Sequence, residues 1–142
     1  MKIITNSPLE TLELGKKVGE NIKAPVSLLI EGSLGSGKTT FIRGVLSYFG
    51  YDIVRSPSFL YVYEYKIPEG KIYHIDLYRI DIEDIDKKLN LSEIIDENSI
   101  FLVEWPYKVK NLNFPNSYEV RINVINDTKR EFISDFFKFI KI

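Results

Sequence analysis

The chain has 142 residues, a usual length for one domain, and 44% of them are hydrophobic, which is enough for one buried core. With 19 basic and 20 acidic residues, the net charge of -1 excludes a globally basic nucleic-acid-binding protein but not a local basic patch. Zero cysteines exclude disulfide scaffolds, thiolate nucleophiles and cysteine-based metal sites, and a single histidine, His74, excludes histidine-rich metal sites. No apolar run reaches the length of a signal-peptide core or a membrane span, so we expect residues 1–142 to form one soluble, cytoplasmic domain.

The N-terminal segment is predicted to form a helix. Residues 7–10, Ser-Pro-Leu-Glu, have the S-x-x-E spacing of a capping box, with proline at the first helical position, where its missing N–H is not needed. Leu14, Val18 and Ile22 then recur every four residues, so this face of the helix should pack inward. Pro25 helps to mark the end of the helical pattern.

A strand, a glycine-bearing loop and a second helix follow. Residues 26–31 (VSLLIE) form a short apolar run typical of a buried strand, and they lead into GSLGSGKTT at residues 32–40. Apolar residues then recur at helical spacing from Phe41 to Phe49, and Gly50 is suited to end this helix.

The middle of the chain predicts a hairpin and then helical structure. Residues 59–67 (FLYVYEYKI) and 71–76 (KIYHID) are typical of two strands, and Pro68-Glu69-Gly70 is typical of a tight turn between them. The charged stretch 82–96 carries apolar residues at helical spacing, so we expect one broken helix or two short helices there.

The last third of the chain returns to strands. Residues 99–104 (SIFLVE) predict a buried strand that ends at Trp105-Pro106, and a loop rich in Asn and Lys follows. Residues 118–124 alternate as a strand, and residues 129–133 can pair back on them after a turn. The tail, residues 134–142, fits either a strand or an amphipathic helix. The alternation of strands and helices indicates an α/β fold.

Residues 32–39 match G-x-x-x-x-G-K-[ST], the P-loop, and such an octamer arises by chance in roughly one chain of this length in two hundred. The glycines permit backbone angles that direct successive N–H groups at phosphate oxygens, and the following helix adds its positive end. Lys38 is expected to reach the β- and γ-phosphates, the Thr39 hydroxyl to ligate Mg²⁺, and Thr40 to meet the α-phosphate. The residues expected to bind the phosphates are Ser33, Leu34, Gly35, Ser36, Gly37, Lys38, Thr39 and Thr40.

An acidic residue at the end of a second buried strand usually holds the metal of such a site, directly or through water. Asp76 and Glu104 each end an apolar run, so either is a candidate.

The alternating position of His74 within a strand favours a packing or hydrogen-bonding role over that of a general base. Arg79 fits equally well a phosphate or partner contact and a surface ion pair. Trp105, as a single tryptophan in a small domain, is expected on sequence alone to anchor the core.

Four sequence blocks follow one another along the chain: GSLGSGKTTF at residues 32–41, SPSF at 56–59, YHIDLYR at 73–79 and VEWP at 103–106. Their order and spacing resemble those of the bacterial TsaE (YjeE) ATPases, which act in making threonylcarbamoyladenosine in tRNA. The resemblance covers most of the chain, from about Thr5 to Pro106.

This resemblance implies a P-loop NTPase fold with a central, mostly parallel sheet flanked by helices and with antiparallel hairpin additions. It also implies ATP and Mg²⁺ as cofactors, slow hydrolysis, and docking on the TsaD and TsaB homologues, with tRNA met through that complex and with no DNA or membrane partner. A small-molecule kinase and a nucleotide-gated binding module without productive hydrolysis stay open as alternatives. The chain lacks the N-K-x-D motif that reads guanine, and its few arginines are scattered, which gives a kinase little support.

Carried over position by position, the resemblance makes Lys38, Asp76 and Glu104 the catalytic residues. Lys38 and Thr39 keep their P-loop roles. Glu104 resembles the Walker-B-type acid that joins Thr39 as a metal ligand, and Asp76 resembles the acid of the HxDLYR block.

The resemblance also suggests residues that couple the nucleotide to a switch or a partner. Ser58 matches a position where the family often has Thr, in a loop resembling a switch near the γ-phosphate. Arg79 and Trp105 belong to the same group, and the resemblance shifts Trp105 toward shaping the nucleotide site or a partner surface. Ser33 stands where the family usually has Asp, which removes a charge near the phosphates but leaves the backbone amides. The family builds its base pocket partly from an N-terminal segment and a late hairpin, and the matching residues are Ser7, Pro8, Thr128 and Lys129.

Overall fold

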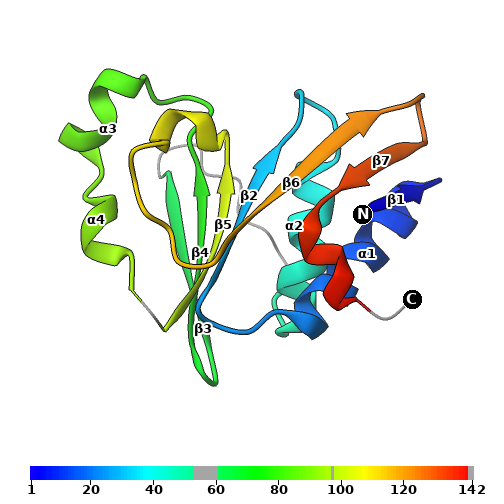
Figure 1. Ribbon diagram of the computed structural model, residues 1–142, viewed down its shortest axis with the longest axis horizontal. Helices are drawn as coiled ribbons and strands as arrows, with labels where there is room; N and C mark the ends of the chain where they lie inside the picture. The colour runs from blue at the N-terminus through cyan, green and yellow to red at the C-terminus, as the bar shows by residue number, and fades with distance from the viewer. Residues whose placement is uncertain (53–60, 97, 141–142) are drawn as a thin grey trace.

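A computed structural model gives the fold, and it describes residues 1–52, 61–96 and 98–140. One seven-stranded sheet runs through the molecule in the order β1-β7-β6-β2-β5-β4-β3 (Figure 1). Its strands are β1 (Lys2–Thr5), β2 (Val26–Glu31), β3 (Val62–Ile67), β4 (Gly70–Asp76), β5 (Ser99–Glu104), β6 (Ser117–Val124) and β7 (Arg130–Ile133). The helices are α1 (Pro8–Asn21), α2 (Lys38–Tyr48), α3 (Ile82–Lys88) and α4 (Leu91–Ile94), with two 3₁₀ helices, η1 (Pro106–Val109) and η2 (Asp135–Phe139).

The central strands of the sheet are parallel. β2 pairs with β5 on one side and with β6 on the other, and β4 pairs with β5. Their carboxyl ends therefore meet at one edge of the sheet, the upper edge in Figure 1. Ligands of open α/β sheets usually bind at such an edge. The antiparallel strands β3, β7 and β1 complete the two sides of the sheet.

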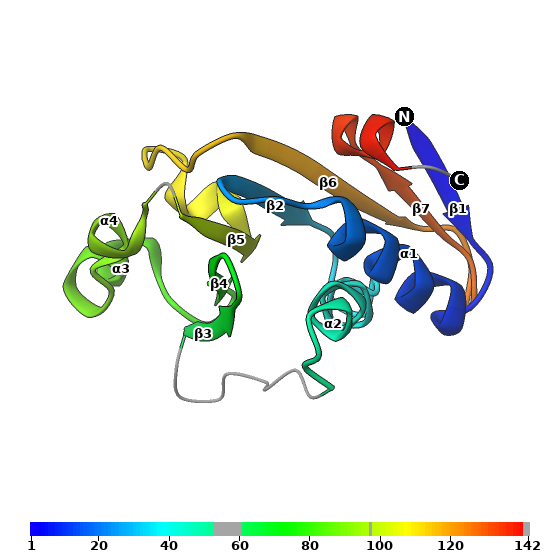
Figure 2. The same cartoon turned by 90° about the horizontal axis from the view of Figure 1, so that it is seen from below.

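Helices α1 and α2 cover one face of the sheet, and the larger hydrophobic core lies between them and the strands (Figure 2). The residues of β5 alternate between two cores. Ile100 and Leu102 belong to the larger core, whereas Phe101 and Val103 belong to a smaller core that includes residues of α3, α4 and η1. β5 is thus buried on both faces, which explains why its sequence is a continuous apolar run.

Helices α1 and α2 touch backbone to backbone. A Cβ added at Gly44 would lie 2.2 Å from the carbonyl oxygen of Leu12, and one added at Gly15 would lie 2.2 Å from that of Phe41. Space rather than backbone angle therefore requires glycine at both positions. This close approach fixes the position of α2, whose first residues belong to the glycine-bearing loop.

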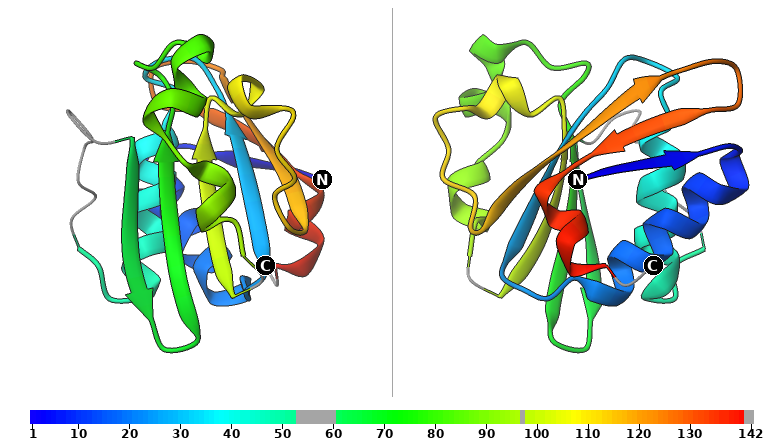
Figure 3. Two further views of the ribbon diagram at one scale, coloured as in Figure 1. Left: turned by 90° about the vertical axis from the view of Figure 1, so that its left-hand side faces the viewer. Right: turned by 45° about the vertical axis from the view of Figure 1, so that its right-hand side comes forward.

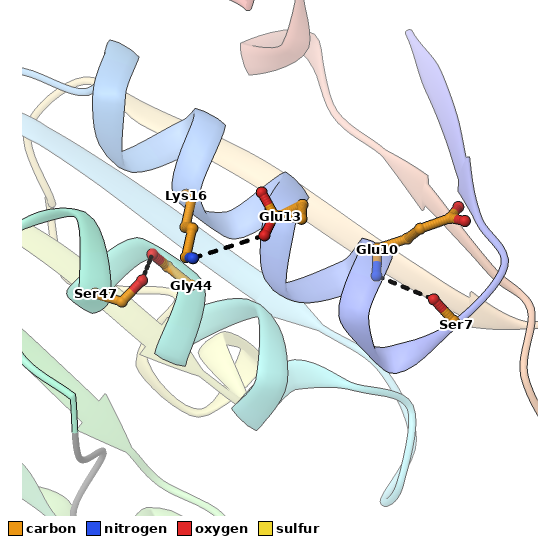
Figure 4. Close-up of polar contacts among 6 residues, drawn as sticks. All are labelled: Ser7, Glu10, Glu13, Lys16, Gly44 and Ser47. Carbon is orange, nitrogen blue, oxygen red and sulfur yellow. Dashed lines mark hydrogen bonds and ion pairs between the residues drawn. The ribbon is translucent and has the colours of Figure 1, made fainter.

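The side chain of Ser7 caps α1, as the capping-box spacing predicts. Its Oγ accepts a hydrogen bond from the N–H of Glu10 at 3.1 Å (Figure 4). The Glu10 carboxylate accepts from the N–H of Asn6 at 3.0 Å, one residue before the position that a capping box usually uses. The start of α1 is therefore satisfied by local side chains.

Replacing Ser7 with alanine is expected to lower the free energy of unfolding by about 1 kcal/mol, because the Glu10 N–H loses its acceptor. Urea unfolding measures the change. Ser92→Ala is the control, since Ser92 is exposed inside the short helix α4. Equal stabilities of Ser7→Ala and the wild type would show that water replaces the cap without loss.

Most predicted elements are confirmed. Leu14 and Val18 are buried on one side of α1, and Ile22, the residue that follows the helix, is buried as well. Gly50 follows α2 with a φ of 91°, the left-handed conformation expected after a helix. The predicted hairpin is formed by β3 and β4, and the stretch 82–96 contains two short helices. In the part of the chain that the structure describes, no helix is long and apolar enough to cross a bilayer.

The sequence left the tail open between two structures and missed the first strand. Of the two alternatives for the tail, the described residues form the helix: Asp135–Phe139 are the 3₁₀ helix η2, which buries Phe136 and Phe137 and which the Ser134 hydroxyl caps by accepting from the Phe136 N–H at 3.1 Å. The sequence also gave no sign of β1, whose four residues form a strand by pairing with β7 near the other end of the chain. Such a short strand depends on its distant partner more than on its own residues.

Candidate functional site

The loop between β2 and α2 has a shape that depends on its glycines. Gly35 and Gly37 have φ angles of 75° and 108°, which residues with a side chain rarely adopt. Gly32 is closely packed: a Cβ there would lie 2.4 Å from the Ser36 Oγ, which could rotate away, and 3.2 Å from the Cβ of Ile122. The loop ends at Lys38, the first residue of α2, where the unpaired N–H groups of a helix start are available to an anion.

A cavity of about 280 Å³ lies beside this loop, at the carboxyl edge of the sheet. Its volume is close to the lower end of the roughly 300–1,000 Å³ that is usual for small-molecule sites. Its lining residues are Leu34, Gly35, Ser36, Gly37, Lys38, Thr39, Thr40, Asp76, Tyr78, Glu104 and Trp105. The fold thus brings the three residues predicted to be catalytic, Lys38, Asp76 and Glu104, to one cavity.

The ammonium group of Lys38 is held by the loop that precedes it. Its Nζ donates to the carbonyl oxygens of Gly32 and, at 2.9 Å, of Ser33, and it lies 4.5 Å from the centre of the Trp105 ring. Burial lowers the pKa of Lys38, and two nearby carboxylates oppose this shift. A phosphate entering the cavity would offer charged acceptors in place of these carbonyls, and an ammonium group bonds more strongly to charged acceptors.

Asp76 and Glu104 end two neighbouring parallel strands and stand opposite each other in the β4–β5 register. Oδ1 of Asp76 accepts a hydrogen bond from the N–H of Tyr78 at 3.1 Å. Burial raises the pKa of Asp76, and the nearby charge of Glu104 raises it further. Asp76 and Glu104 both line the cavity. Asp76 is half-buried, whereas Glu104 is only 5% exposed.

The partner of His74 was not predicted. Its Nε2 lies 2.7 Å from Oε2 of Glu104, which confirms the hydrogen-bonding role favoured by the sequence. Among the described residues, Nδ1 of His74 has no hydrogen-bond partner. The signal was present in the chain: once YHID and FLVE are paired as parallel neighbours, His74 and Glu104 fall on the same face, two residues apart in register.

Replacing Asp76 with asparagine is expected to raise the stability of the metal-free protein at neutral pH. The raised pKa of Asp76 means that the folded state binds this proton more tightly than the unfolded chain does. The free energy of unfolding therefore falls as the pH rises from the ordinary aspartate pKa through the raised pKa. Asparagine carries no ionisable proton and can still accept from the Tyr78 N–H, so it avoids this loss.

Thermal unfolding of the Asp76→Asn variant and the wild type from about pH 4 to about pH 8 measures the effect. The difference in Tm should widen in favour of Asp76→Asn as the pH rises. Asp135→Asn is the control, because Asp135 is exposed in η2. A Tm difference that does not change with pH would contradict the raised pKa.

Trp105 has an uncommon backbone conformation for a residue other than glycine, with φ at 60° and ψ at 50°. Its ring packs against Tyr78 with 5.0 Å between ring centres, and it lies beneath the Lys38 ammonium group. The indole also packs against the smaller core. Trp105 therefore combines the core contact expected from the sequence alone with a place in the wall of the cavity.

Lys108 was not singled out by the sequence, although it fixes one side of the site. Its Nζ donates to the carbonyl oxygens of Leu77 at 2.8 Å, Tyr78 at 3.0 Å and Ile80 at 2.8 Å. These bonds use all three protons of the ammonium group. They tie η1 to the turn after β4, and this turn carries Tyr78 into the cavity wall.

The oxygen-bearing side chains of the cavity fit Mg²⁺. Thr39 and Glu104, the two residues predicted to bind the metal, both line it, and so does Asp76. Mg²⁺ usually binds through one or two carboxylates, several waters and substrate phosphates. Residues 1–52, 61–96 and 98–140 contain no group of three or more His, Cys, Asp or Glu side chains placed to hold a metal. A metal ion here would thus need ligands from phosphate and water.

Comparison with known sequences identifies the family. The sequence model described as "Threonylcarbamoyl adenosine biosynthesis protein TsaE" matches residues 5–132. The chain belongs to the TsaE family. The protein named "tRNA threonylcarbamoyladenosine biosynthesis protein TsaE" from Rickettsia prowazekii is 36% identical over 128 residues, which cover 88% of each chain. The protein of the same name from Aquifex aeolicus is 34% identical over 133 residues, which cover 92% of each chain.

A solved structure supports the same conclusion. The crystal structure of YdiB from Bacillus subtilis superposes on this TsaE-family chain with a TM-score of 0.75 and 30% sequence identity, covering 93% of this chain and 82% of that one. The resemblance to TsaE and the P-loop fold with a mostly parallel central sheet are therefore confirmed.

Among the described residues, some that were predicted for the TsaE-family site are not part of the cavity lining. Arg79 is exposed in the turn after β4, and Ser58 lies outside the described residues. Ser33 is exposed, and its carbonyl oxygen accepts from Lys38. The residues predicted for base binding are not among those that line the cavity; they are Ser7, Pro8, Thr128 and Lys129. Their roles stay predictions.

Proposed function

We propose that this TsaE-family protein binds and slowly hydrolyses ATP, and that it regulates a cytoplasmic assembly of TsaD and TsaB homologues that makes N6-threonylcarbamoyladenosine in tRNA. The observation that carries the proposal is the cavity that joins the P-loop, Lys38, Asp76 and Glu104 in a chain matched by the TsaE family over residues 5–132. In this proposal residues 1–142 are a single ATPase domain, and the protein acts on tRNA only indirectly, through the complex.

Each side chain has a role that suits its position. Lys38 stabilises the negative charge that develops on the γ-phosphate, and the N–H groups of the P-loop hold the remaining phosphate oxygens. Thr39 and Glu104 would hold Mg²⁺, which neutralises phosphate charge when it is bound. The hydrogen bond from His74 fixes the orientation of Glu104.

Asp76 is the group proposed to position the attacking water. It lies at the end of β4, next to the turn that Lys108 holds, so its carboxylate is presented from a fixed backbone. Of the residues that the structure describes, no arginine lines the cavity. P-loop hydrolases that lack such a group in place are slow until a partner completes the site. Slow turnover by the protein alone follows from this arrangement.

Phosphate release from Mg-ATP tests the proposal. The purified protein is assayed alone and with the TsaD and TsaB homologues of its own organism, with Lys38→Met as the blank. We expect slow release by the protein alone and faster release in the presence of the pair. No release in either condition would contradict the ATPase proposal.

Two further measurements separate the alternatives. Radiolabelled phosphate that moves from ATP to a small metabolite would identify a kinase. Partner binding that requires ATP but is unchanged with a non-hydrolysable analogue, without turnover, would identify a nucleotide-gated binding module.

A further inference from the structure

Arg130 lies beside the P-loop although the two segments are far apart in the sequence. It is the first residue of β7, and the β6–β7 hairpin reaches the same end of the molecule as the β2–α2 loop (Figures 1 and 3). On β7, Arg130 shares a face with Phe132, whose ring packs against Phe41 of α2 with 5.4 Å between centres. The side chain of Arg130 is therefore on the face of the sheet that α2 covers.

The guanidinium group of Arg130 joins the P-loop to the hairpin. Its Nε donates to the carbonyl oxygen of Ser36 at 2.9 Å, and Nη2 donates to that of Gly35 at 3.3 Å. Its Nη1 donates to the carbonyl oxygens of Asn126 at 2.6 Å and Lys129 at 3.0 Å. One planar, rigid group thus contacts two successive carbonyls of the P-loop and two of the hairpin turn.

The hairpin turn is a fixed support for this group. Oδ1 of Asn126 accepts from the backbone N–H of Thr128 at 3.0 Å and from that of Lys129 at 2.9 Å. The N–H of Ile125 donates to the carbonyl oxygen of Lys129 at 3.1 Å. The turn is closed by its own hydrogen bonds, so it holds Arg130 without help from the P-loop.

The contacts with Gly35 and Ser36 fix the orientation of two peptide planes. In a planar trans peptide, the carbonyl of one residue and the N–H of the next point in opposite directions. When Arg130 holds the carbonyl of Ser36, the N–H of Gly37 must point away from the guanidinium group. Gly37 lines the cavity, and glycines with positive φ can turn their peptide planes easily. The Ser36 N–H is already held by the carbonyl oxygen of Ser33 at 3.1 Å, so the contact that Arg130 adds is the restraint on the peptide plane between Ser36 and Gly37.

Arg130 carries its charge without a direct ion pair among the described residues. None of the ion pairs within the described ranges involves Arg130. All of its hydrogen bonds go to neutral carbonyl oxygens, and a guanidinium group stays ionised at any ordinary pH. Its field adds to that of Lys38 and favours an anion at the loop.

We propose that Arg130 is a positioning residue for phosphate binding: it holds the P-loop in the shape that receives a phosphate chain and adds a fixed positive charge behind it. This inference rests on the proposed function, because it takes the cavity at the P-loop as a phosphate site. It gives the β6–β7 hairpin a role at the phosphates through Arg130, whereas the resemblance to the TsaE family implied a role at the base through Thr128 and Lys129.

Calorimetric binding of inorganic tripolyphosphate and of ATP, each with Mg²⁺, tests the inference in an Arg130→Met variant. Methionine keeps an apolar stem but removes the charge and the donors. We expect the affinity for both ligands to fall by the same factor, about tenfold to a hundredfold. Turnover at saturating ATP should change much less than KM. An affinity for tripolyphosphate equal to that of the wild type would overturn the inference, as would a loss confined to ATP, which would place Arg130 at the base.

Two matched variants exclude simpler explanations. Arg121→Met removes the same charge from the same hairpin, but Arg121 is exposed on the opposite face of the sheet. The affinity of the Arg121→Met variant for tripolyphosphate and for ATP should therefore match that of the wild type. Arg130→Lys keeps the charge with fewer donors and should recover part of the affinity; affinity no better than that of Arg130→Met would overturn the proposed charge. If the wild type itself binds neither ligand, the proposed function fails, whereas wild-type binding with an unaffected Arg130→Met variant makes this inference alone fail.

Discussion

A Lys38→Met variant is expected to hydrolyse ATP about 100 to 1,000 times more slowly than the wild type, because one preorganised donor to the reacting phosphate is lost. The fold should survive this change. The ammonium group of Lys38 is buried and its lowered pKa shows that burial disfavours the charge, so its removal relieves desolvation while it leaves two carbonyl oxygens without a donor. These effects oppose each other, and stability should stay within about 1 kcal/mol of the wild type.

Phosphate release and urea unfolding together test this expectation. Lys17→Met is the control, since Lys17 is exposed on α1 and away from the cavity. Turnover near the wild-type rate in a folded Lys38→Met variant would show that the ammonium group does not act on phosphate. Loss of the fold would instead show that the contacts of Lys38 with Gly32 and Ser33 are needed for the loop to form.

A Gly44→Ala variant is expected to lose about 3 kcal/mol of folding free energy. The added methyl group would meet the carbonyl oxygen of Leu12 at 2.2 Å, and a backbone atom cannot move aside as a side chain can. Helices α1 and α2 must then separate, which exposes part of the larger core to water. Because α2 begins at the P-loop, the variant should also bind phosphate less tightly, even at temperatures where it is folded.

Urea unfolding of single and double variants measures this effect. Gly15 of α1 and Gly44 of α2 face each other where the two helices touch, because a Cβ added at Gly44 would lie 2.8 Å from the α-carbon of Gly15. Gly15→Ala combined with Gly44→Ala should therefore destabilise less than the sum of the two single changes, because the first change already separates the helices. A fully additive pair would show that the two glycines do not share one contact.

The sequence predicted the parts of this protein that depend on neighbouring residues. The P-loop is marked by its own glycines and Lys38, and the cap of α1 is marked by Ser7 within its first turn, so both could be located before the fold was known. Asp76 and Glu104 were found because each ends an apolar strand. The choice between strand and helix for the tail stayed open because η2 is set by its packing on β6 rather than by a periodic pattern.

Residues that act on distant main-chain atoms could not be predicted in this way. Lys108 and Arg130 bind carbonyl oxygens, which every residue carries, so no side-chain type in the sequence marks the partner. The contact of Gly15 with Gly44 was hidden for a related reason, since it depends on the distance between two helix axes. His74 stands between these cases, because its partner Glu104 becomes visible once the parallel strands are aligned.

The use of carbonyl oxygens by Lys108 and Arg130 also affects how this protein can change over generations. A side-chain acceptor is lost when its codon mutates, but a main-chain acceptor survives any substitution that keeps the local backbone. The turn after β4 can therefore exchange the exposed side chain of Tyr78 without losing the main-chain contact with Lys108. Inherited variation should be smaller at Lys108 than at this exposed accepting position.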